Sequence, residues 1–211
     1  MGDEEKILNL IKDQVGSDNQ KGWPVAVKDR VSYHCAKEGS LKPADVAVTF
    51  LWTMRDAVVP KLDKEKLAIA TNFYTPSGIN GMIRNILGNP CIRYIIMLGE
   101  EYASKDGSDT KTENTSANAL RAFFEKGIND DRQIPGFEQS VYFDKNIPAE
   151  MIDKVRESVE LIDLNTEFPD HTLQQKIDEA NRLMNDLEDK GPFMEEPKTF
   201  EYEEASESFP H

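Results

Sequence analysis

Two short stretches of the sequence place ligand-binding residue types at the ends of apolar runs. The first, residues 71–78 (TNFYTPSG), closes the apolar run LAIAT, and its Thr75 and Pro76 are typical of the start of a helix. Backbone N–H groups at such a start can hold a phosphate or a carboxylate. The candidate ligand-binding residues of this stretch are Asn72, Tyr74, Thr75, Ser77 and Gly78. An ordinary strand-to-helix turn would use the same residues, and both interpretations stay open.

The second stretch is Gly99-Glu100-Glu101, which follows the apolar residues 92–98. Glycine permits a close approach of the backbone, and a carboxylate can accept hydrogen bonds from a ring N–H or a ribose hydroxyl. Gly99, Glu100 and Glu101 are therefore candidate cofactor-binding residues. The competing interpretation is that the two glutamates are solvated loop residues.

Other common chemistries have no motif in this sequence. His34, His171 and His211 are scattered and have no HxxxH or CxxC companion, so we predict no metal-binding residues. His34 and Cys35 are neighbours, and neighbours in a strand point to opposite faces, which disfavours a base and thiol pair. The chain contains no GxGxxG, GxxxxGK[ST] or GxSxG. The catalytic residues, and whether the protein is an enzyme, stay open.

Composition limits the classes of binding partner and the cellular compartment that we expect for this protein. Acidic residues number 39 against 25 basic ones, a net charge of −14 at pH 7, which disfavours attraction to nucleic acid or to an anionic membrane. Two cysteines, Cys35 and Cys91, provide no disulfide framework, so we expect a reducing, cytoplasmic setting. No apolar run approaches the roughly 18–20 residues of a membrane span, and we predict none.

The elements that must position these residues alternate along the chain. Apolar runs predict strands over residues 46–52, 67–71, 92–98 and 159–164, and helical spacing predicts helices over residues 4–15, 75–87, 115–126 and 170–189, with a short helix from Asn146. Alternation of this kind predicts an α/β fold, a three-layer sandwich with a mostly parallel, Rossmann-like sheet. Ligands bind such sheets at the carboxyl ends of the strands.

We expect four parts along the chain. They are an N-terminal helix and link (1–20), an α/β domain (21–168), a C-terminal helix (169–190) capped by Asp170, and an acidic linker or tail (191–211). The C-terminal helix has one apolar side and must pack on the domain or on a partner. The tail is acidic and contains prolines, which is more typical of a linker or a docking arm than of a core element.

Several motifs together resemble one family. They are GWPV (22–25), GINGMIRNIL (78–87), NPCIRYIIMLGEE (89–101), FFEKGIND (123–130) and NIPAEMIDKVRESVELIDL (146–164). In this order they resemble the cytoplasmic domain of the A-subunit of tetrahydromethanopterin S-methyltransferase, which carries the corrinoid of an archaeal methyl-transfer complex. The module is also similar to segments associated with thymidylate synthase-like proteins, which work on reduced pterin or folate one-carbon units.

The resemblance implies a cofactor site with one altered residue. In the family a loop after GxE carries a histidine that serves as the lower axial ligand of cobalt, and its position falls on Asn114 here. An amide is a poor substitute for imidazole on cobalt. The resemblance thus implies a corrinoid or a reduced pterin or folate, held by residues 72–78 and 99–101 and by the segment 112–118. In that segment Asn114 is a candidate cofactor-binding residue, as part of a mobile lid or as an altered ligand contact. From the resemblance we also expect the helix and the acidic tail to stand where many such proteins have a membrane anchor.

Three functions follow from the resemblance. The leading hypothesis is a cofactor-binding or accessory module of one-carbon metabolism, as the N-terminal domain or partner of a thymidylate synthase-like or methyltransferase protein. A second hypothesis is an active corrinoid methyl carrier that uses another axial donor or none. A third is a non-catalytic interaction domain that holds partners through the helix at 170–189 and the tail.

Overall fold

A four-stranded sheet forms the centre of the protein. The structure, a computed structural model, describes residues 45–63, 67–101, 115–138, 140–198 and 200. The strands are β1 (Val46–Thr49), β2 (Leu67–Thr71), β3 (Tyr94–Met97) and β4 (Glu160–Asp163). The predicted helix at 4–15, the GWPV motif, the pair His34 and Cys35, and Asn114 all lie outside the described residues.

The sheet has the order β2-β1-β3-β4, and each neighbouring pair is parallel. Val46 of β1 pairs with Leu67 of β2 and with Tyr94 of β3, which fixes the register at the amino ends of the strands. Every residue of β1 and β3 is buried, as expected of central strands covered on both faces. All carboxyl ends therefore lie at one edge, where the sequence predicts the ligand site.

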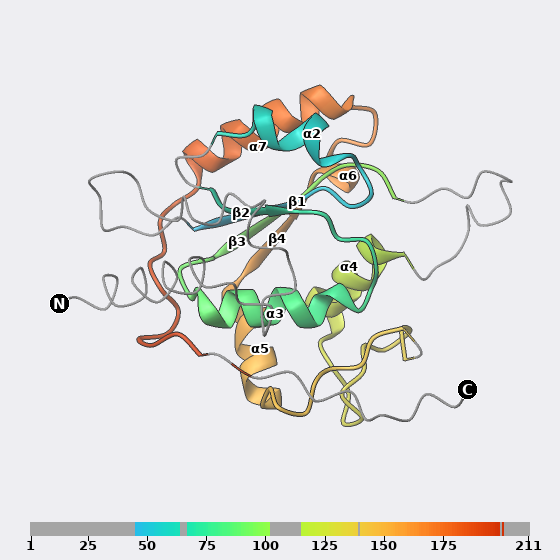
Figure 1. The fold of residues 1–211 in the computed structure, drawn as a ribbon, viewed down its shortest axis with the longest axis vertical. Coiled ribbons are helices and arrows are strands. Elements are labelled where there is room, and N and C mark those ends of the chain that lie inside the picture. Colours follow the sequence, from blue (N-terminus) through green and yellow to red (C-terminus); the bar gives the residue numbers. More distant parts are fainter. Residues whose placement is uncertain (1–44, 64–66, 102–114, 139, 199, 201–211) are drawn as a thin grey trace, which may run out of the picture.

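Helices cover both faces of the sheet, which confirms the predicted three-layer α/β architecture (Figure 1). On one face lie α3 (Gly78–Gly88), α4 (Ser116–Lys126) and α5 (Ala149–Ser158). On the other lie α2 (Arg55–Val58), the 3-10 turn η3 (Val59–Lys61), α6 (Leu164–Glu167) and α7 (Leu173–Asp186). No helix within the described ranges has the length and apolar character needed to cross a lipid bilayer.

Side-chain alternation along the strands divides the interior into two cores. On β3, Tyr94 and Ile96 point into the core beneath α7, and Ile95 and Met97 point into the core beneath α3. Helix α7 contributes its apolar side, Ile177, Ala180 and Met184, to the first of these cores. The single-sided C-terminal helix is thus packed on its own domain.

Two predicted helix caps are wrong. Helix α7 is capped by Thr172, not Asp170: the Thr172 hydroxyl accepts from the Gln175 N–H while the Gln175 side chain accepts from the Thr172 N–H. The hydrogen bonds between Thr172 and Gln175 satisfy two backbone N–H groups, whereas the Asp170 carboxylate alone would satisfy fewer. Helix α3 begins at Gly78 after Ser77, so Thr75 lies outside the helix and caps nothing.

The first part of the predicted acidic tail also packs on the domain. The N–H of Phe193 donates to the Pro90 carbonyl, and the N–H of Lys198 donates to the Leu87 carbonyl. Met194 is buried in the core beneath α3. Because residues 193–198 cross the end of α3 and cover part of this core, they are a structural element of the domain and not a free linker. The division into four parts otherwise stays a prediction.

Candidate functional site

The segment that follows β1 connects the two predicted ligand-binding stretches at the carboxyl edge of the sheet. The Asn72 side-chain amide donates to the Leu51 and Thr53 carbonyls, both at 2.8 Å, and the Phe73 N–H donates to the Leu51 carbonyl at 3.3 Å. Leu51 is fully buried and has a left-handed backbone, with φ of 49°. A non-glycine residue in this conformation persists only where its surroundings hold it, and here Asn72 does so.

The second stretch is joined to the same segment from the other side. The Trp52 N–H donates to the Glu100 carbonyl at 2.9 Å, and the Glu100 N–H donates to the Thr53 hydroxyl at 2.8 Å. Gly99 has φ of 90°, and a Cβ there would lie 2.5 Å from the Phe50 carbonyl oxygen and 2.5 Å from Thr53 Oγ1. The glycine is therefore required by the close passage of the chain after β1.

Trp52 and Thr53 are not among the candidate site residues that the sequence predicts. Like those candidates, however, these two residues lie at the end of an apolar run that predicts a strand. The apolar run 46–52 predicts one strand, but the strand ends at Thr49 and the chain turns there. The available signal is the general one, that residues following a parallel strand lie at the ligand edge. Applied to β1 as well as to β2 and β3, it would have found them.

An exposed aromatic pair lies at this edge. The rings of Trp52 and Tyr74 meet edge to face with centroids 4.8 Å apart. Trp52 is 40% exposed and Tyr74 is 51% exposed, and the neighbouring Met54 is 75% exposed. Exposed apolar side chains in contact with each other are more informative than single ones, because they leave a surface that a flat apolar molecule can cover. We call Trp52 and Tyr74 the aromatic platform.

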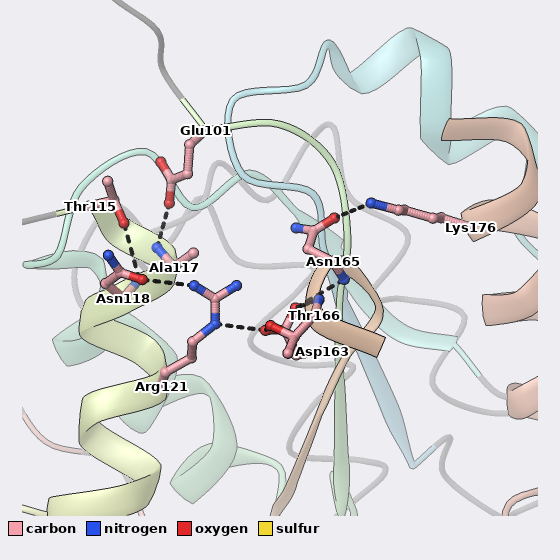
Figure 2. A network of polar contacts seen from close by, with 9 residues as sticks. All are labelled: Glu101, Thr115, Ala117, Asn118, Arg121, Asp163, Asn165, Thr166 and Lys176. Carbon is pink, nitrogen blue, oxygen red and sulfur yellow. Dashed lines mark hydrogen bonds and ion pairs between the residues drawn. The ribbon is translucent and has the colours of Figure 1, made fainter. Parts of the chain in front are cut away.

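The two glutamates have different surroundings. The Glu101 carboxylate accepts from the Ala117 N–H at 2.5 Å and from the Ser116 hydroxyl at 3.1 Å, so it neutralises the N-terminus of α4 (Figure 2). The Glu100 side chain is exposed. Of the predicted pair, Glu100 is thus the exposed one, and its backbone carbonyl accepts from the Trp52 N–H, while Glu101 positions a helix.

The helix start at residues 75–80 offers less to an anion than its sequence suggests. The N–H groups of Gly78, Ile79 and Asn80 donate to the carbonyls of Thr75, Pro76 and Ser77. The Thr75 and Ser77 hydroxyls bond each other at 2.9 Å. Because a tight turn leads into the helix, these three N–H groups already have partners within the chain.

A polar network joins α4 to the end of β4 (Figure 2). Arg121 donates through Nε to Asp163 Oδ2 at 2.6 Å and through Nη1 to Asn118 Oδ1 at 2.7 Å. The other Asp163 oxygen accepts from the N–H groups of Asn165 and Thr166. Desolvation acts to raise the pKa of the Asp163 carboxyl, but hydrogen bonds from Arg121 and Thr166 outweigh it, so the pKa lies below the ordinary 3.8. Asp163 therefore stays charged and fixes Arg121 between the two elements.

The sequence profile of one family, MtrA, the A-subunit of tetrahydromethanopterin S-methyltransferase, matches residues 17–208. The match covers nearly the whole chain and includes all four strands of the described sheet. The chain belongs to the MtrA family. The resemblance seen in the sequence motifs is confirmed.

Three relatives of this MtrA family member carry the name of the A-subunit of tetrahydromethanopterin S-methyltransferase. The protein of Methanopyrus kandleri is 27% identical over 190 residues, which is 89% of this chain and 68% of the relative. The first of two such proteins in Methanothermobacter thermautotrophicus is 26% identical over 189 residues, 89% of this chain and 69% of the relative. The second is 26% identical over 178 residues, 83% of this chain and 84% of the relative.

The described residues of this MtrA family member do not supply an imidazole to a corrinoid on the α4 side of the sheet. His171 is the one histidine within the described ranges, and its ring stacks on Phe168 with centroids 4.7 Å apart, between α6 and α7 on the opposite face. Within those ranges no three His, Cys, Asp or Glu side chains gather as metal ligands. The described donor set thus does not fit a histidine-ligated cobalt, and Asn114 lies outside it.

Proposed function

We propose that this chain is a cofactor-binding module of one-carbon metabolism that works beside a methyltransferase protein. It binds the flat ring system of a one-carbon cofactor at the carboxyl edge of its sheet. Two cofactor types share this chemistry, a corrinoid and a reduced pterin or folate. The relatives carry the names of methyltransferase subunits, and for this reason we choose a methyltransferase over a thymidylate synthase-like protein as the partner.

The observation that carries the proposal is the aromatic platform at the ends of the strands. The loops after β1 and β2 present Trp52 and Tyr74 to solvent, and hydrogen bonds to Glu100 and Asn72 hold both loops in place. In open parallel sheets this edge is where ligands bind. Exposed indole and phenol rings in that position provide contact area for another conjugated ring, worth about 0.5–1.5 kcal/mol for each stacked pair.

The residues around the platform would have separate tasks. Trp52 and Tyr74 would cover one face of the ring and exclude water from it. The exposed Glu100 carboxylate would accept an N–H or O–H from the ring edge or its substituents, which a carboxylate does with charge assistance. The Thr53 hydroxyl, which accepts from the Glu100 N–H, and Gly99, which permits the close chain passage, would fix the position of Glu100.

Fluorescence of Trp52 tests the proposal directly. The chain has two tryptophans, so Trp23→Phe leaves Trp52 as the single reporter. This variant is titrated with hydroxocobalamin in one arm and with tetrahydrofolate in the other, after correction for absorbed light with free tryptophan. We expect saturable quenching in one arm, and the arm that responds identifies the cofactor type.

Platform variants then separate stacking from other contacts. Tyr74→Ala should weaken binding about tenfold, since roughly 1.4 kcal/mol corresponds to a factor of ten, whereas Tyr74→Phe keeps the ring and should retain most of the affinity. Calorimetry measures both. Linear, non-saturating quenching in both arms would refute cofactor binding and would leave the platform as a docking surface of an interaction domain.

A further inference from the structure

A cavity of about 200 Å³ lies inside the domain, between the sheet and α3. Its walls are mostly apolar and come from β1, β2 and β3 and from α3 and α4. They include Ala47, Ile69, Met82, Ile86, Ile95 and Leu120. The exposed Tyr74 and Thr75 line the outer end and Gly78 borders it, so the cavity leads inward from the loop after β2.

Two buried side-chain oxygen atoms of residues that line this cavity have no hydrogen-bond partner. They are Thr49 Oγ1 and Asn85 Oδ1, and each residue is only 5% exposed. Buried polar atoms in native proteins are nearly always paired, because desolvation without a hydrogen bond costs free energy. Two such atoms lining one cavity therefore indicate a guest molecule that satisfies them.

The fold explains why both side chains point inward. Thr49 is two residues after Ala47 on β1, so both face α3. On α3, Met82, Asn85 and Ile86 occupy i, i+3 and i+4, the spacing of one helix face, and all three line the cavity. In the sequence, the sign of a polar group facing this cavity is an asparagine in the middle of an apolar helix face. An assignment based only on hydrophobic periodicity does not detect it.

We propose that this cavity is a binding site for a small planar molecule of one or two fused rings that is largely apolar and carries one N–H or O–H donor. An engineered apolar cavity of about 150 Å³ takes up benzene, so about 200 Å³ suits a slightly larger, bicyclic ring. The donor is required by Asn85 Oδ1, which only accepts, while the Thr49 hydroxyl can donate or accept. The cavity shares Tyr74 with the aromatic platform, but this proposal does not depend on the proposed function.

Indole is the probe, because it is bicyclic and has a single N–H. Indene, of the same size and shape but without the donor, is its matched control. Both are titrated calorimetrically into the full chain. We expect saturable 1:1 binding of indole. Indene should bind about tenfold more weakly, because one net hydrogen bond contributes roughly 1.4 kcal/mol, which corresponds to a factor of ten in affinity.

Two variants locate the site. Ala47→Leu fills the cavity from β1 and should abolish the binding of both probes, and Thr49→Val, which keeps the shape, should lower the affinity for indole several-fold while leaving indene unchanged. Circular dichroism and the thermal midpoint confirm that each variant is folded. If Ala47→Leu does not fold, Asn85→Leu replaces it, with loss of the preference for indole as the expected result.

Three results would overturn the proposal. One is the absence of saturable indole binding by the wild-type chain, which would mean that ordered water satisfies Thr49 and Asn85. Another is indole binding that persists unchanged in a folded cavity-filling variant, which would place the probe elsewhere. The last is equal affinity for indole and indene, which would remove the role of the two polar atoms.

Discussion

Replacement of Gly99 by alanine adds a single methyl group, yet it should strongly lower the stability of this protein. The new Cβ would lie 2.5 Å from the Phe50 carbonyl oxygen and 2.5 Å from Thr53 Oγ1, at a backbone φ of 90°. The left-handed conformation costs a non-glycine residue about 1–2 kcal/mol, and relieving the overlap by a local shift costs about 1–3 kcal/mol more. Gly99→Ala should therefore lower the free energy of unfolding by about 2–5 kcal/mol.

Gly136 provides a matched control. Its φ is 93°, nearly that of Gly99, but nothing lies within 4 Å of a Cβ built there. Gly136→Ala should incur only the backbone cost, about 1–2 kcal/mol. The difference between the two variants isolates the close passage of the chain after β1.

Urea unfolding followed by circular dichroism measures both free energies by linear extrapolation. We expect Gly99→Ala to be less stable than Gly136→Ala by about 1–3 kcal/mol. Thr53→Ala combined with Gly99→Ala should recover part of this loss, because it removes one of the two overlapping atoms. A difference between the alanine variants below about 0.5 kcal/mol, the usual error of additivity, would refute the steric argument for Gly99.

Three further predictions concern other parts of the structure. Asp163→Ala should lower the free energy of unfolding by about 1–2 kcal/mol near neutral pH, because a helix cap is lost. Since the pKa of Asp163 in the folded protein lies below 3.8, this loss should be complete above pH 3.8 and should vanish as the pH falls through the folded-state pKa. Urea titrations at several pH values would show or contradict this dependence. Thr172→Ala should lower the thermal midpoint by the equivalent of about 1 kcal/mol, while Asp170→Ala should leave it unchanged, and the reverse order would reject the observed cap. Asp144→Ala should cost about 3–5 kcal/mol because it removes the carboxylate that pairs with the buried Arg84 guanidinium. Arg84→Met with Asp144→Leu should cost less in the same urea assay.

The fold follows from local patterns because buried parallel strands have a composition of their own. LAIAT and YIIM are continuous apolar runs, and they form β2 and β3 with nearly the predicted bounds. The predicted caps at Thr75 and Asp170 are wrong because residues of several types at neighbouring positions can begin a helix, and reciprocal bonds such as that of Thr172 with Gln175 decide between them.

The site is only partly predictable, because its assembly depends on contacts between distant segments. The sequence points to Asn72 and Glu100, yet each is placed by residues 51–53, which pass between them. Likewise, no local pattern reveals that Asn85 shares a cavity with Thr49. Such pairings arise from strand order, and strand order is set by the whole domain.

The position of β4 in the sheet also determines when the domain can close during synthesis. β4 pairs with β3 although α4 and α5 separate them in the chain, and α7, which covers Tyr94 and Ile96, follows later still. An apolar sheet face therefore stays open until almost all of the described chain has left the ribosome. Pairings between such distant segments fold slowly and expose aggregation-prone surface, so chaperone supply during expression should govern the yield of folded protein.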